Sequence, residues 1–97
     1  MAAVGAKVKK AKSWYVWDVV PASSLYCMRC HSPFLELVQK DPTGRVVYHA
    51  APLACLKCAT ARELADAVKT IYSFARGSRD RARLVKRLFS YIRRGRV

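Results

Sequence analysis

Four cysteines stand in two pairs with the same spacing. Two residues separate Cys27 from Cys30. The same spacing separates Cys55 from Cys58, and the sequence contains four cysteines in all. Two intervening residues allow one tight turn to present both thiolates to a single point, and two such turns supply the four soft ligands of a tetrahedral metal site. The spacing therefore predicts that the four cysteines hold one structural zinc ion, with iron as the alternative metal.

Other uses of paired cysteines fit this sequence less well. A thioredoxin-like redox site needs one Cys-x-x-Cys that follows a strand and opens a helix, and no βαβ pattern precedes the pairs. A disulfide framework belongs to secreted proteins, whereas residues 1–13 are rich in Ala and Lys and do not predict a secretory leader. Because four cysteines complete a structural shell, we leave His31 and His49 out of it.

The residues between the pairs predict a β-hairpin. Two short runs, residues 34–40 and 45–49, flank the sequence Asp-Pro-Thr-Gly at residues 41–44, which fits a type I turn closed by a left-handed Gly44. The two arms are similar in length, so the hairpin should return the second pair to the first. A further strand is predicted at residues 14–20, ending before Pro21, with Trp14 and Trp17 on opposite faces.

A helical pattern follows the second pair. Thr60 and Glu63 form a capping box ahead of an apolar stripe, and Gly77 is expected to end that helix. Ser78 is then expected to cap a second helix over residues 79–94. The expected fold class is α+β: a basic arm at residues 1–13, a small three-stranded antiparallel zinc-binding unit at residues 14–58, and a basic helical hairpin with a tail at residues 59–97.

Charge gives the clearest indication of a partner. The chain has 19 Lys and Arg against 6 Asp and Glu, a formal net charge of +13. Solubility of a small domain needs a net charge of only about 2 to 8, so the excess predicts a polyanionic partner, which is most often nucleic acid. The residues expected to contact phosphates lie at the two ends: Lys7, Lys9, Lys10, Lys12, Arg79, Arg83, Lys86, Arg87, Arg93, Arg94 and Arg96.

The two cysteine pairs around a hairpin resemble the zinc-ribbon superfamily. The resemblance covers about a third of the chain and implies one zinc ion on a small sheet. Both knuckles lack the Gly that often follows the second cysteine in ribbons, and carry His31 and Ala59 instead. In size and charge the chain is similar to small basic ribbons of archaeal and eukaryotic ribosomes, and the absence of Asn indicates a thermophilic source.

We therefore expect a cytoplasmic ribosomal protein that binds rRNA within a larger ribonucleoprotein assembly, in preference to DNA. A DNA-associated or RNA polymerase-associated transcription protein is the first alternative, and a protein-interaction adaptor is the second. No Gly-rich phosphate loop is present, and Asp41 at the hairpin tip is followed by Pro42 rather than by a second carboxylate. We expect no catalytic activity, no small-molecule substrate and no membrane partner.

Overall fold

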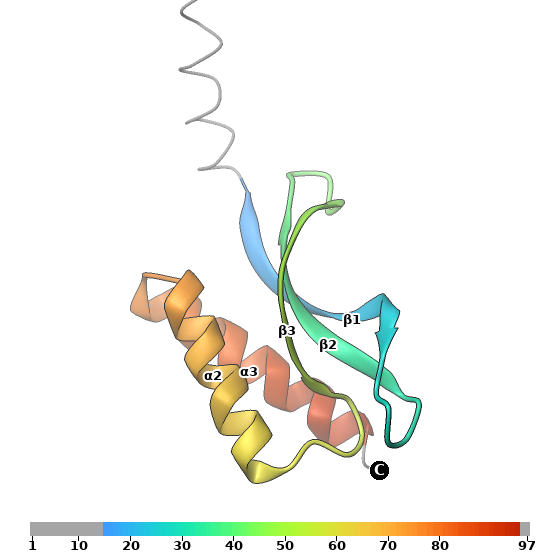
Figure 1. The fold of residues 1–97 in the computed structure, drawn as a ribbon. Coiled ribbons are helices and arrows are strands. Elements are labelled where there is room, and N and C mark those ends of the chain that lie inside the picture. Colours follow the sequence, from blue (N-terminus) through green and yellow to red (C-terminus); the bar gives the residue numbers. More distant parts are fainter. Residues whose placement is uncertain (1–14, 96–97) are drawn as a thin grey trace, which may run out of the picture.

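The computed structural model describes residues 15–95. Its elements are β1 (Val16–Tyr26), β2 (Pro33–Lys40), β3 (Val46–Cys55), α2 (Ala61–Phe74) and α3 (Ser78–Gly95). The strands form one antiparallel sheet in sequence order, and the two helices lie side by side next to it (Figure 1). The predicted α+β class, with a three-stranded sheet followed by two helices, is confirmed. Trp14 lies outside the described residues, so its placement opposite Trp17 stays a prediction.

The hydrophobic core lies between the sheet and the two helices. Every third or fourth residue of each helix points into it, as an amphipathic helix requires. The most buried side chains of this core come from all five elements: Val19, Leu35, Leu37, Ala54, Cys55, Ala67, Ile71, Leu84 and Leu88. Cys55 belongs to this set, so the second cysteine pair begins inside the core.

Strand β1 is longer than the sequence predicted. It was expected to end before Pro21, but it continues to Tyr26 and pairs Pro21 with Leu35 of β2. Proline is tolerated here because β1 is an edge strand, where a missing N–H can face away from the sheet. A shift of register between Pro21 and Tyr26 bends the strand and delivers the chain to the first cysteine pair.

The hairpin turn forms as predicted. The Asp41 carboxylate accepts hydrogen bonds from the N–H and hydroxyl of Thr43 and from the N–H of Arg45, at 2.6 to 3.0 Å. Gly44 has φ +87°, and its N–H donates to the Asp41 carbonyl at 2.9 Å. The return strand is longer than the predicted residues 45–49, because β3 runs to Cys55 through several register shifts against β2.

The two helix ends near residue 77 differ from the prediction. Helix α2 ends at Phe74, and the Arg81 guanidinium donates to the carbonyls of Tyr72 and Ala75 at 2.9 and 2.7 Å. The Arg81 side chain of α3 therefore donates hydrogen bonds to carbonyls at the end of α2, where we expected Gly77 to end the helix. Ser78 was expected to be a cap, but it is the first residue of α3, and the Gly77 carbonyl accepts the N–H of Arg81 at 2.9 Å.

Candidate metal centre and basic face

The four cysteine sulfur atoms come together, although they lie in two turns far apart in the sequence. All four Sγ atoms lie within 4.8 Å of one another. The shortest separations are 3.3 Å between Cys27 and Cys58 and 3.4 Å between Cys30 and Cys55. A disulfide would place two sulfurs about 2.05 Å apart, whereas four ligands at about 2.3 Å from one ion lie about 3.8 Å apart. The four sulfurs are therefore close enough together to hold a single metal ion.

Local backbone geometry shapes both turns. Backbone N–H groups donate to the first sulfur of each pair: Arg29 to Cys27 at 3.4 Å, and Cys58 to Cys55 at 3.3 Å. The first turn closes through His31 N–H to the Cys27 carbonyl at 2.9 Å. This closure places His31 at φ 62°, in the left-handed region where a ribbon usually has Gly. The second turn leads directly into α2 and has no such residue.

The thiols differ in acidity. Hydrogen bonds from the N–H groups of Cys30 and Arg29 lower the pKa of Cys27 to about 6. Contact with the sulfurs of Cys27 and Cys55 raises the pKa of Cys58 to about 12. Adjacent negative charges repel each other, so the four thiolates need a cation among them to be stable together. The donor set and its geometry therefore fit one metal ion.

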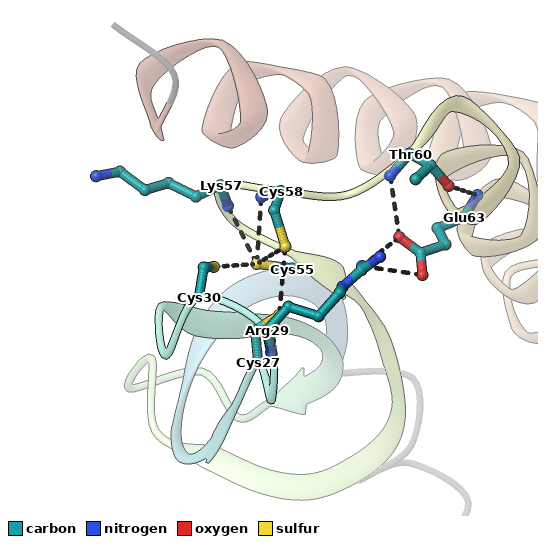
Figure 2. A network of polar contacts seen from close by, with 8 residues as sticks. All are labelled: Cys27, Arg29, Cys30, Cys55, Lys57, Cys58, Thr60 and Glu63. Carbon is teal, nitrogen blue, oxygen red and sulfur yellow. Dashed lines mark hydrogen bonds and ion pairs between the residues drawn. The ribbon is translucent and has the colours of Figure 1, made fainter.

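Each cysteine turn also contacts one helix. Figure 2 shows Arg29, from the first turn, reaching the Glu63 carboxylate at 2.8 and 3.1 Å. The same carboxylate accepts the N–H of Thr60 at 2.9 Å, which completes the predicted capping box of α2. At the second turn, Gly95 at the end of α3 lies so close that an added Cβ would be 2.7 Å from the Leu56 carbonyl oxygen. The metal centre is therefore attached to both helices.

Neither histidine belongs to the cluster of possible ligands within residues 15–95. His49 Nδ1 is 3.0 Å from Glu36 Oε1 on the neighbouring strand, and Glu36 is otherwise buried. The cluster of possible ligands found among residues 15–95 consists of the four cysteines.

The structure describes some of the residues that were predicted to contact phosphates, but not all of them. Lys7, Lys9, Lys10, Lys12 and Arg96 lie outside residues 15–95. The others are all on α3 and all exposed: Arg79, Arg83, Lys86, Arg87, Arg93 and Arg94. Helix α3 thus carries six exposed cations, and the single acid in its first turn is Asp80.

Two of these cations connect α3 to strand β1. Arg83 Nη2 donates to the Trp17 carbonyl at 2.9 Å and to Asp80 at 3.1 Å. Arg87 Nε is 2.5 Å from Asp18, a carboxylate that Lys40 Nζ also contacts at 2.8 Å. These contacts could not be predicted from the sequence, because neither Asp18 nor the Trp17 carbonyl belongs to a motif.

Asp18 is buried beside these cations. Burial alone would raise its pKa, but hydrogen bonds from Lys40 and from the Val19 N–H, together with the charge of Arg87, lower the pKa below the usual 3.8. A carboxylate with a lowered pKa stabilises the fold at neutral pH, and this contribution is lost as the pH falls through the lowered pKa.

Comparison of the chain with protein-family models, with curated proteins and with solved structures returned no significant match. Within residues 15–95, no helix is both long enough and apolar enough to cross a membrane. The cysteine cluster and the charged surface are therefore the features of the molecule that indicate a function.

Proposed function

We propose that the protein is a zinc-stabilised, RNA-binding module of the zinc-ribbon type. The zinc ion would be held by Cys27, Cys30, Cys55 and Cys58 and would act as a structural cross-link, since four thiolates leave no open position for a substrate. The proposal assigns the protein a binding role rather than a catalytic one.

The observation that carries the RNA-binding proposal is the exposed, unbalanced charge of α3. Three acids elsewhere in the described chain are already engaged: Glu63 with Arg29, Asp41 with its own turn, and Glu36 with His49. Asp80 and Asp18 pair with Arg83 and Arg87, so four of the six exposed cations of α3 have no ion-pair partner within residues 15–95: Arg79, Lys86, Arg93 and Arg94. A row of cations on a rigid helix contacts phosphates at a low entropic cost, and arginine does so through paired N–H donors.

A salt titration of RNA binding tests this proposal on the intact, metal-loaded chain. Neutralising about six phosphates should reduce affinity about a thousandfold between low and physiological salt. The informative variant replaces Lys86, Arg93 and Arg94 with Gln, because none of these forms an ion pair within residues 15–95. Its matched control replaces Arg62, Lys69 and Arg76, three exposed cations in and just after α2.

The α3 variant should reduce both the affinity and the salt slope more than the α2 control, although each loses three charges. Removal of residues 1–12 should have a smaller effect, because the cations of α3 are already held at fixed spacing by the helix and lose less conformational entropy on binding. Equal losses of affinity in the two triple variants would mean that the cations of α3 are only part of a general solvated surface. Failure of the intact chain to bind RNA would refute the proposed function and favour the adaptor alternative.

The assignment to a ribosome is a narrower proposal, based on small size and high positive charge. Co-sedimentation of the native protein with ribosomal particles at moderate salt is its test. Co-purification with RNA polymerase, together with tighter binding to duplex DNA than to RNA, would instead support the transcription alternative. Elemental analysis of natively purified protein distinguishes zinc from iron.

A further inference from the structure

A shallow, open pocket on the exposed side of α3 lies within the basic surface. It has a volume of about 270 Å³ and is lined by Arg83, Lys86, Arg87 and Ser90. These residues are spaced three, four and seven positions from the first, so successive turns of one helix bring them to the same face. The pocket therefore concentrates three cations and one hydroxyl at a single place.

The lining groups retain hydrogen-bond donors for a ligand. The known contacts of Arg83 use one terminal nitrogen, and the ion pair of Arg87 uses Nε. A guanidinium has five N–H donors, so both arginines have others available. The Ser90 oxygen accepts from Arg94 Nη2 at 3.5 Å, which leaves its hydroxyl hydrogen able to donate. The pocket thus presents donors rather than acceptors.

The protein itself holds the two arginines in place. Arg87 is fixed by Asp18, and Asp18 is fixed in turn by Lys40 and by the Val19 N–H at 2.8 Å. Arg83 is fixed by the Trp17 carbonyl. Side chains that are already ordered lose less entropy when a ligand binds, so their donors are worth more to an incoming anion.

The local charge stays positive after these contacts. Asp18 carries one negative charge and pairs with two cations, Arg87 and Lys40, while Asp80 pairs with Arg83. Lys86 has no ion-pair partner within residues 15–95, and the Arg94 guanidinium lies nearby over the Tyr91 ring, 4.9 Å from its centre. A single anion would be attracted by this arrangement without displacing the structural carboxylates.

We propose that this pocket binds one phosphodiester group of the RNA backbone. The inference rests on the proposed function and adds a defined anchor point to it. Two guanidiniums, an ammonium and a hydroxyl suit a tetrahedral oxyanion with several acceptor oxygens, because arginine and lysine donate to phosphate from different directions. Contacts of this kind fix the position of an RNA strand without reading its bases.

The first experiment asks whether the pocket is an anion site, using inorganic phosphate and the metal-loaded full chain. Amide signals of residues 83–90 should shift and saturate in an NMR titration, and Ser90→Ala should weaken the response several-fold. Ser73→Ala on α2, whose hydroxyl donates to the Thr70 carbonyl, is the control and should change nothing. Shifts that do not saturate, or an unchanged response in Ser90→Ala, would overturn the proposed anion site.

The second experiment compares single charge removals in RNA binding. Lys86→Gln should reduce RNA affinity about tenfold at low salt and lower the salt slope by about one. Lys69→Gln removes the same charge at an exposed position of α2 and should reduce RNA affinity by less than about twofold. If both variants lose affinity equally, RNA binding stands and the anchor pocket is refuted. If the intact chain binds phosphate but no RNA, the ligand assignment and the proposed function are both refuted.

Discussion

The two cysteine turns have the same spacing but different surroundings. The first, at residues 27–30, begins at Cys27, which is only 3% exposed, and then runs along the surface, where Met28 is 94% exposed and Cys30 is also exposed. The second, at residues 55–58, starts in the core, with Cys55 only 1% exposed and Leu56 packed against Gly95. Both turns therefore begin in the core, but the first continues at the surface whereas the second stays partly buried.

Their connections to the helices differ in the same way. The first turn contacts α2 through the Arg29–Glu63 pair, whose side chains are 54% and 44% exposed. Exposed pairs of this kind contribute about 1 kcal/mol or less. The second turn is held by direct packing against α3. We infer that residues 28–30 of the first turn depend on the metal for their position, whereas the second turn depends on both the metal and the core.

The largest expected effect is the loss of a metal ligand in the core. Cys55→Ser should abolish stoichiometric metal binding and unfold the sheet, because structural metal binding is worth on the order of 10 kcal/mol in small domains. Cys30→Ser should keep the metal at reduced affinity, since its neighbours can remain in place. Metal content, thermal unfolding and competition with a chelator measure the difference. Equal losses in the two variants would contradict the inferred asymmetry.

A smaller effect is expected where α3 meets the second turn. In Gly95→Ala the new Cβ would lie 2.7 Å from the Leu56 carbonyl oxygen and 3.0 Å from Leu56 Cγ. Overpacking of this kind should lower the free energy of unfolding by about 1 to 2 kcal/mol, which exceeds the gain in helix propensity. Gly77→Ala is the control, because nothing lies within 4 Å of its added Cβ. Chemical denaturation of both metal-loaded variants provides the comparison.

The smallest effect is expected at the first turn, and it is a gain. His31→Gly should raise the free energy of unfolding by about 0.5 to 1 kcal/mol, because His31 at φ 62° pays the steric cost of the left-handed region. Ala59→Gly, at the corresponding position of the second turn, should destabilise the protein, since Ala59 is buried and lacks a positive φ. A stabilised Ala59→Gly, or a destabilised His31→Gly, would show that the two turns are not distinguished by backbone strain.

Features encoded within a few residues could be predicted from the sequence. The two cysteine turns, the Asp-Pro-Thr-Gly turn and the capping box of Thr60 and Glu63 each depend on local chemistry, and each forms in the structure. The amphipathic stripes likewise predicted two helices, because their period alone determines which side faces the core.

Features that depend on neighbours distant in sequence could not be predicted. Strand β1 passes Pro21 because it lies at an edge, and an edge position is a property of the assembled sheet. Helix α2 ends where Arg81 of the next helix reaches its last carbonyls. Asp18 reads as an ordinary strand residue, yet it joins β1 to β2 and α3 through Lys40 and Arg87. No periodicity marks such contacts.

The bond from Arg83 to the Trp17 carbonyl bears on self-association. The outer edge of β1 is the kind of surface to which a strand from another molecule can add, because it presents unpaired backbone groups. Arg83 occupies one of these acceptors at 2.9 Å, and Pro21 further along the strand has no N–H to offer. Helix α3 therefore reduces the number of backbone groups that β1 offers for edge-to-edge pairing, at the same place where the helix displays its charge.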